Sequence, residues 1–220
     1  MNLGQHFLVN EETIKRFVSY VDLSFRPIIE IGGGKGNITK YIKPDVVIEI
    51  DKRFSSYLRN LVIADARFLP VIRGQIVSSL PYYITYEFFE EIIRIDQIKK
   101  LILILQYDFV KKILNEPTYI SFILNYYYKI DVKENIPPWF FKPKPRVYST
   151  IVLFTRIRSY DEKINLILKC ISKYRNKKIT NAVKLCNLSS SLSTDINKRV
   201  RDFKPCQVLE LLNIISTKYV

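Results

Sequence analysis

The segment from Arg26 to Asp51, RPIIEIGGGKGNITKYIKPDVVIEID, constrains the fold of this chain more than any other. An apolar run over Ile28–Ile31 leads into a glycine-rich loop, and a second apolar run over Val46–Ile50 ends in an acid. This pattern predicts a strand, a glycine loop, a helix and a second strand. Glycines let the backbone approach a ligand, and the first turn of the helix offers free N–H groups. The loop is therefore expected to hold a nucleotide-like ligand.

The glycine spacing narrows the choice of ligand. A dehydrogenase fingerprint has glycine at its first, third and sixth positions, but the sixth position counted from Gly32 is Asn37, and no Lys-Ser/Thr pair follows for a triphosphate. The remaining pattern, E-x-G-x-G-x-G, is the form associated with S-adenosylmethionine. Glu49 and Asp51, at the end of the second strand, are expected to accept hydrogen bonds from ribose hydroxyls. The alternative is a glycine turn needed only to pack the helix on the strand.

Composition indicates a packed protein with a polyanionic partner. The chain has 220 residues, of which 48% are hydrophobic and only 6 are glycine, enough for one core and a small appendage. Its net charge of +14 fits nucleic acid or an anionic membrane, although basicity alone can also reflect solubility or genome composition. No apolar run approaches the ~18 residues of a membrane span, and the start does not resemble a cleaved signal. A cytoplasmic protein is expected.

The cysteines and the single histidine indicate a reducing compartment and no metal site. Cys170, Cys186 and Cys206 are odd in number and lack C-x-x-C spacing, and His6 is the only histidine. These cysteines are predicted to be ordinary packing residues of C-terminal helices.

Two polar segments are expected to complete the ligand site around the glycine loop. GQHFL, at residues 4–8, precedes a helix capped by Asn10, and it is predicted to fold over the ligand with Gln5 hydrogen-bonded to it. The alternative is a frayed terminus with a solvated His6. Asp65 follows a short strand and faces the same crevice, where it is expected to accept a hydrogen bond from an adenine amino group. Alternatively, Asp65 caps a polar turn.

The segment SLPYYIT, which follows a strand at residues 75–78, is the predicted chemical centre. Pro81 stiffens the turn and fixes the orientation of the Leu80 carbonyl. It also presents Tyr82 at the end of the strand. The Ser79 hydroxyl and the Leu80 carbonyl suit the amine of a flat base, and Tyr82 suits its ring. The alternative is a proline turn with inward-packed tyrosines.

Two later segments carry aromatic and basic residues. Strands and helices alternate up to residue 136, which predicts an open, mostly parallel sheet. In the proline-rich segment 137–149, Phe141 is expected to cover the other face of the base. Lys142, Lys144 and Arg146 are expected to lie beside phosphates. The alternative is that this segment forms an aromatic lid over the core. From Ser159 onward the pattern predicts a small helical domain. Its basic face either binds RNA or is simply solvated, and it carries Lys173, Arg175, Lys177, Lys178 and Lys184.

The motifs GQHFL, EIGGGKG, VIEID, ADA, SLPYYIT, FKPKPRVYS and YRNKKITNAV, in this order, resemble the rRNA adenine N6-dimethyltransferases of the kasugamycin-resistance type. The likeness runs from Gly4 to about Val183 and more weakly through KRVRDFKPCQVLELL. It implies an α/β, Rossmann-like class I methyltransferase sheet of seven strands with the last antiparallel, at residues 1–157. It also implies a small C-terminal helical RNA-binding domain at residues 158–220.

The resemblance also implies roles for individual residues by motif position. S-adenosylmethionine would contact Gln5, His6, Leu8, Gly32, Gly34, Glu49, Ile50, Asp65, Ala66 and Ser79. The target adenine would be held by Ser79, Leu80, Pro81, Tyr82 and Phe141. RNA would contact Lys142, Lys144, Arg146, Arg175, Lys177 and Lys178. This chain departs from the family in having Ser79 where the motif normally begins with Asn, a shorter C-terminal domain and no basic residues before GQ.

The expected function is methyl transfer from S-adenosylmethionine to the N6 amine of two adjacent adenosines near the 3′ end of small-subunit rRNA. The partner would be that RNA or a pre-ribosomal particle, and the protein a monomer without metal or membrane contact. One alternative is the large-subunit adenine methyltransferase that confers macrolide resistance. The other is a non-catalytic RNA-binding or transcription factor on the same fold.

Overall fold

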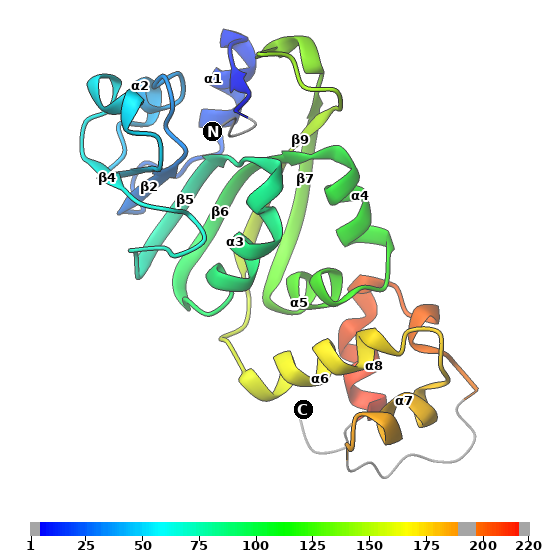
Figure 1. Cartoon of the computed structure of the whole chain (residues 1–220). Helices are drawn as coiled ribbons and strands as arrows, with labels where there is room; N and C mark the ends of the chain where they lie inside the picture. The colour runs from blue at the N-terminus through cyan, green and yellow to red at the C-terminus, as the bar shows by residue number, and fades with distance from the viewer. Residues whose placement is uncertain (1–4, 189–196, 216–220) are drawn as a thin grey trace. The chain divides into compact units, whose positions relative to one another are not determined.

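The computed structural model describes residues 5–188 and 197–215, and its main element is a seven-stranded sheet (Figure 1). The strand order is β4-β3-β2-β5-β6-β9-β7. The strands are β2 (Ile28–Ile31), β3 (Val46–Glu49), β4 (Leu61–Ile63), β5 (Arg73–Ser79), β6 (Gln97–Gln106), β7 (Tyr128–Ile136) and β9 (Ser149–Arg156). The pairs from β4 through β6 are parallel, whereas β9, the last strand in the chain, runs antiparallel to β6. The predicted class of sheet is confirmed.

The helices follow the strands in the alternation that the sequence predicts. They are α1 (Glu11–Ser19), α2 (Thr39–Ile42), α3 (Thr85–Ile92), α4 (Tyr107–Asn115), α5 (Tyr119–Tyr127), α6 (Glu162–Lys173), α7 (Ile179–Leu185) and α8 (Val208–Ile215). Asn10 caps α1 as predicted, because its side chain accepts a hydrogen bond from the Thr13 N–H at 2.9 Å. After β3 the chain forms a 3-10 helix over Lys52–Tyr57. No helix in the described part of the chain is long and apolar enough to cross a membrane.

A second, two-stranded sheet joins the N-terminal segment to the proline-rich segment. Its strands are β1 (Phe7–Leu8) and β8 (Phe141–Lys142), paired antiparallel so that Leu8 lies opposite Phe141. The Val9 N–H extends the pair by donating to the Phe140 carbonyl at 2.8 Å. Leu8 and Phe141 are both buried in a cluster with residues of β6 and β9. The N-terminal segment is thereby fixed to the rest of the sheet domain.

The chain divides into two compact units. The first comprises residues 1–110 and 129–156, and the second comprises residues 111–128 and 157–220. The second unit has its own core, to which α6, α7 and α8 contribute fully buried side chains: Leu168, Ile171, Ala182 and Leu211. The boundary at residue 156 lies next to the predicted one, but the grouping of residues 111–128 with the later helices was not predicted. The assignment of catalysis and RNA binding to separate units stays a prediction.

A disulfide in the second unit corrects the prediction for the cysteines. Cys170, on α6, is bonded to Cys186, which follows α7, while Cys206 is free and exposed. The fold of the second unit brings the two sulfurs together across a separation of 16 residues, which no local spacing reveals. The cysteine spacing alone therefore does not indicate the redox compartment, because it did not reveal this pair.

Candidate functional site

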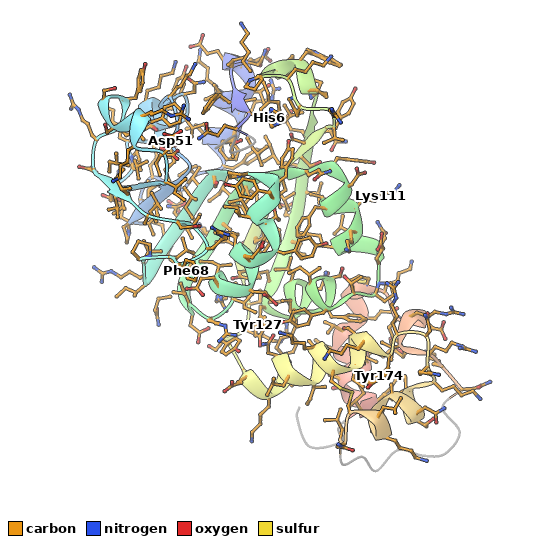
Figure 2. The ribbon with its side chains drawn as sticks, viewed as in Figure 1. His6, Asp51, Phe68, Lys111, Tyr127 and Tyr174 are labelled. Carbon is orange, nitrogen blue, oxygen red and sulfur yellow. A yellow bond between two sulfur atoms is a disulfide. The ribbon has the colours of Figure 1, made fainter. Side chains whose placement is uncertain are left out.

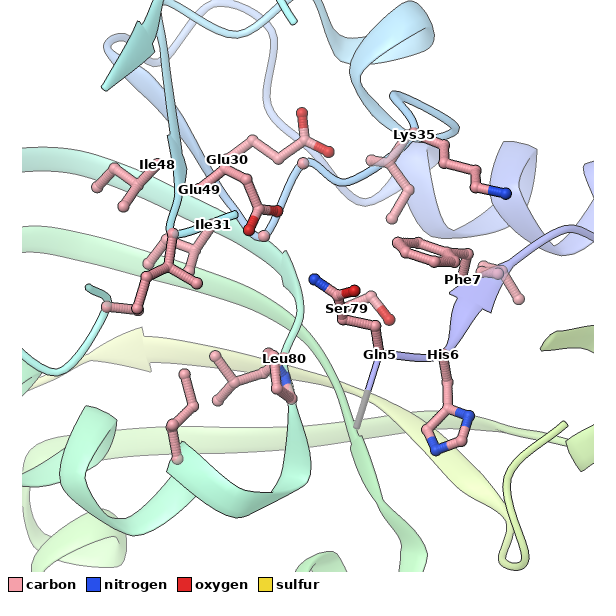
Figure 3. Close-up of a pocket in the computed structure, with 18 of the residues that line it drawn as sticks. Gln5, His6, Phe7, Glu30, Ile31, Lys35, Ile48, Glu49, Ser79 and Leu80 are labelled. Atoms are coloured by element: carbon pink, nitrogen blue, oxygen red, sulfur yellow. The ribbon is translucent and has the colours of Figure 1, made fainter. Parts of the chain in front are cut away.

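A pocket lies at the carboxyl ends of β2, β3, β4 and β5, where ligands collect in parallel sheets (Figure 3). Its volume is about 1010 Å³, including the part open to solvent, which is ample for a nucleoside-sized ligand. All the predicted catalytic residues line it, and so do the predicted cofactor-binding residues except Gly34. The lining also includes side chains that the sequence did not single out for the site: Phe7, Glu30, Lys35, Asn37 and Tyr83.

The glycine loop is held in place by Glu49. One Glu49 oxygen accepts a hydrogen bond from the Gly34 N–H at 3.0 Å, and the other accepts from the Asp51 N–H at 2.9 Å. Gly34 has φ +50°, and a Cβ there would lie 2.5 Å from the Phe7 ring, so any other residue would be strained. At Gly32, with φ +72°, a Cβ would meet no atom within 4 Å. The loop therefore leaves space beside a buried carboxylate, as a bound ribose requires.

The other two acids of this edge are each paired with an arginine. Arg53 holds the pKa of the Asp51 carboxyl well below its usual range through a 2.6 Å hydrogen bond, and Asp51 does not line the pocket. Asp65 does line the pocket, and its hydrogen bonds to Arg67 likewise lower its pKa. Of the two acids expected at the ribose, only Glu49 lines the pocket. Asp65 faces the predicted crevice, but its carboxylate oxygens already accept hydrogen bonds from the Arg67 guanidinium.

The N-terminal segment covers the pocket from β1. Residues from Gln5 to Leu8 all line it, and Figure 3 shows Gln5 and His6 on the segment that leads into β1 and Phe7 on the strand itself. The His6 ring donates from Nδ1 to the Pro143 carbonyl at 2.7 Å, since a carbonyl can only accept. Asn37 donates to the Leu8 carbonyl at 2.8 Å. The segment folds over the pocket rather than fraying, although Gly4 of the same motif lies outside the described residues.

The strand-end motif forms the opposite wall. The Leu80 N–H donates to the Ile104 carbonyl at 3.2 Å, which orients the turn before Pro81. Within the described residues the Ser79 hydroxyl makes no hydrogen bond, so it is available to a ligand. These two residues present the hydroxyl and carbonyl oxygens that the sequence predicts for an amine.

Two aromatic residues of the predicted site differ in their surroundings. The Tyr82 ring stacks on His6 at 6.2 Å, and its hydroxyl shares a 2.5 Å hydrogen bond with Ser149. Burial raises the pKa of Tyr82, and the Ser149 contact opposes that shift. Phe141 lines the pocket but is only 2% exposed, because it packs beside Leu8 in the core. The aromatic partner that the structure places beside Tyr82 is therefore His6, which the sequence associated with the cofactor.

Glu30 is the main residue of the pocket that the sequence reasoning missed. It lies on β2 and is 2% exposed, and its Oε2 has no hydrogen-bond partner within the described residues. Burial raises its pKa to about 7; the negative charge of Glu49 adds to the shift, and the nearby Thr39 hydroxyl opposes it. Its position as the first residue of E-x-G-x-G-x-G was the available signal. A buried, unpaired carboxyl suits a ligand that carries positive charge, as S-adenosylmethionine does.

The predicted RNA-binding residues are exposed in both units. Lys142, Lys144 and Arg146 follow the pocket-lining Phe141, and Arg175, Lys177 and Lys178 follow α6. None of the six forms an ion pair with a residue that the structure describes. Across residues 5–188 and 197–215, no group of three or more His, Cys, Asp or Glu side chains is arranged to hold a metal ion.

Comparison with known sequences identifies relatives along nearly the whole chain. The model of the family described as Ribosomal RNA adenine dimethylase matches residues 1–71 and 70–216. The ribosomal RNA small subunit methyltransferase A of Mycoplasma genitalium is 31% identical, with 98% of this chain and 96% of the relative covered. A probable enzyme of the same name from Methanococcus maripaludis strain C7 is 30% identical, covering 99% of this chain and 88% of the relative.

Solved structures show the same fold. A dimethyladenosine transferase from Plasmodium falciparum superposes with a TM-score of 0.72 at 18% identity, covering 94% of this chain and 96% of the other. The 23S rRNA methyltransferase ErmE superposes with a TM-score of 0.69 at 20% identity, covering 95% and 99%. The chain therefore belongs to the ribosomal RNA adenine dimethylase family and is a methyltransferase that uses S-adenosylmethionine to modify ribosomal RNA.

Proposed function

We propose that this protein dimethylates the N6 amines of two adjacent adenosines near the 3′ end of small-subunit rRNA. Its relatives are named for the small subunit, and its net charge of +14 suits an RNA or pre-ribosomal particle as substrate. It acts in the cytoplasm as a monomer. The observation that carries the proposal is one pocket in which a glycine loop and Glu49 lie opposite Ser79, Leu80 and Tyr82.

Bound S-adenosylmethionine supplies an electrophilic methyl group. Gln5, Glu30, Glu49 and Asp65 are the polar side chains of the pocket placed to hold such a donor, and the glycine loop gives it room. Phe7 and Leu8 cover this part of the pocket and help to exclude water from it.

The adenine amine is a poor nucleophile because its lone pair is delocalised into the ring. The Ser79 hydroxyl and the Leu80 carbonyl accept its two hydrogens, which favours a pyramidal nitrogen and the positive charge that develops on it. The extruded base is held by Tyr82, with Phe141 at the pocket wall. Stacking of about 1–3 kcal/mol per aromatic face offsets the few kcal/mol needed to take the base out of its stack.

The test is methyl incorporation into small-subunit particles isolated from cells that lack the protein. Tyr82→Ala is expected to reduce transfer by about 5- to 150-fold, the equivalent of the ~1–3 kcal/mol of one stacked base. It should leave binding of labelled S-adenosylmethionine in place. Glu49→Ala is expected to weaken donor binding instead. Tyr107→Ala, an exposed tyrosine that does not line the pocket, is the matched control and should be unaffected.

Mass spectrometry of the modified RNA then separates the possible substrates. Dimethyl groups on two adjacent adenosines of the small subunit support the proposal. Modification of the large subunit would assign the chain to the macrolide-resistance type, because a 23S rRNA methyltransferase has the same fold as this chain. Donor binding without methyl transfer to any ribosomal substrate would refute the proposed reaction, and a chain that binds no donor would be a non-catalytic factor.

A further inference from the structure

Two large aromatic side chains of the first unit are exposed outside the pocket. Trp139, in the turn after β7, is 60% exposed, and Tyr148, directly before β9, is 46% exposed. Neither residue lines the pocket, and neither was given a role by the sequence reasoning. Trp139 is also the only tryptophan of the chain. Neither the core nor the pocket accounts for these two rings, which makes them a candidate binding surface.

Tyr148 lies close to Tyr82 of the pocket. Ser149, the residue that follows Tyr148, shares a 2.5 Å hydrogen bond with the Tyr82 hydroxyl. The Tyr148 carbonyl accepts from the Tyr107 N–H at 2.9 Å, which ties it to the carboxyl end of β6. β6 is the parallel neighbour of β5, the strand that leads to Tyr82. Figure 1 shows the segment between β7 and β9 at the end of the sheet where β6 passes into α4. The exposed rings therefore lie at the same edge of the sheet as the pocket.

Trp139 is held beside Tyr148 by its own surroundings. The two ring centroids are 6.2 Å apart and the ring planes make an angle of 78°, an edge-to-face contact. The Phe140 ring, which packs partly against the core, also contacts Trp139, at 6.4 Å. The turn is anchored by the buried Pro138 and by the Val9 N–H, which donates to the Phe140 carbonyl at 2.8 Å. Perpendicular rings leave open faces that a parallel stack would cover, so the pair is a fixed aromatic surface that faces solvent.

The charge around the two rings favours a nucleic acid over a protein partner. Three exposed cations lie between the rings in the sequence: Lys142, Lys144 and Arg146. From residue 135 to residue 160 the chain has no Asp or Glu. Exposed rings interleaved with cations are typical of surfaces that stack the bases of a single strand. A hydrophobic protein segment would cover the rings but leave the cations without a counter-charge.

We propose that Trp139 and Tyr148 form a stacking platform for the unpaired base next to the adenosine that occupies the pocket. The proposal rests on the proposed function for the identity of the RNA. Extruding one adenosine removes a stacking partner from the neighbouring base, and an aromatic ring outside the pocket replaces that partner. Stacking accepts any base, so the platform positions the strand without reading its sequence. Trp139 and Tyr148 are thus positioning residues, while the chemistry takes place in the pocket.

The fluorescence of the single tryptophan reports on this contact directly, because a base stacked on an indole ring quenches its emission. The full chain is titrated with an unmodified 3′-terminal fragment of small-subunit rRNA under tryptophan-selective excitation. The emission of Trp139 should be quenched as the fragment binds. Inorganic polyphosphate, which carries the charge without the bases, should leave the emission unchanged. An absence of quenching at saturating RNA, or equal quenching by polyphosphate, would overturn the proposal.

Two substitutions at Trp139 separate an aromatic face from hydrophobic bulk. Trp139→Leu should weaken binding of the labelled fragment by about 5- to 150-fold, the loss expected for one stacked base. Trp139→Phe keeps a ring and should retain most of the affinity. Phe68→Ala is the matched control, because Phe68 is a 75% exposed ring that does not line the pocket, and Figure 2 shows it well apart from His6. Equal losses in the leucine and phenylalanine variants, or a loss no larger than in the control, would contradict stacking.

Methyl transfer by the same proteins separates this proposal from the proposed function. Trp139→Leu should raise KM for the RNA and leave kcat little changed, because the platform does not touch the reacting atoms. Binding of labelled S-adenosylmethionine should be the same in all four proteins, which shows that each variant is folded. If RNA quenches Trp139 but no ribosomal substrate is methylated, the proposed function fails and the platform stands. Methylation of small-subunit RNA without quenching would have the opposite meaning.

Discussion

Replacing Glu30 by glutamine is expected to make the stability of the protein less sensitive to pH. Glu30 is buried, with a folded-state pKa of about 7 against 4.5 for an ordinary glutamate. A raised carboxyl pKa means that the folded state binds the proton more tightly than the unfolded state. Folding stability is therefore lost as the pH rises from about 4.5 to about 7, and the full penalty persists above that window.

The size of the effect follows from the shift. A difference of about 2.5 pKa units at about 1.36 kcal/mol per unit corresponds to about 3 kcal/mol. Glutamine does not titrate, so Glu30→Gln removes this penalty. The free energy of unfolding of the variant should rise relative to that of the unaltered protein by about 3 kcal/mol between pH ~4.5 and pH ~8.

Urea denaturation at both pH values, without donor, measures this difference. Groups elsewhere whose pKa is lowered, such as Asp22 and Asp51, change the stability of both proteins alike and cancel in the comparison. Thr39→Val serves as the control, because it alters the nearby hydroxyl while leaving the charge in place. A stability difference that is the same at both pH values would refute the reasoning.

Three further outcomes are expected. Gly34→Ala should lower the free energy of unfolding by about 1–2 kcal/mol or more and weaken the binding of S-adenosylmethionine, because φ is +50° and the new Cβ meets Phe7. An unchanged affinity for S-adenosylmethionine would contradict this. Tyr82→Phe keeps the ring but loses the hydroxyl bond to Ser149, so methyl transfer should fall about fivefold, less than in Tyr82→Ala. Cys186→Ser should lower the free energy of unfolding by about 3 kcal/mol, or the Tm by about 6–12 °C, and the Tm of this variant should not change when reductant is added. If reductant also leaves the Tm of the unaltered protein unchanged, the disulfide is contradicted.

Local patterns predicted the part of the fold that local physics determines. The apolar runs at Ile28–Ile31 and Val46–Ile50 became parallel neighbours, and the glycines between them adopted positive φ where the loop turns. Glu49, Asp65 and the Ser79 motif reached one crevice because the carboxyl ends of parallel strands meet at one edge of the sheet. These features depend on residue type and spacing alone, so a single sequence reveals them.

The features that escaped prediction depend on contacts between distant segments. β1 and β8 have two residues each, too few to show any periodicity, and their pairing joins Phe7 to Lys142. The same distance hid the disulfide and the stacking of His6 on Tyr82. The raised pKa of Glu30 arises from complete burial next to a second acid, which requires knowing what covers β2.

The β1–β8 pair ties together two segments of the pocket that lie far apart in the sequence. One of its strands contributes Phe7 and Leu8 to the lining of the pocket, and the other contributes Phe141 and leads into the exposed Lys142 and Lys144. Because backbone hydrogen bonds tie the two strands, neither can shift without the other. A change in the position of one of these segments at the pocket is therefore expected to displace the other.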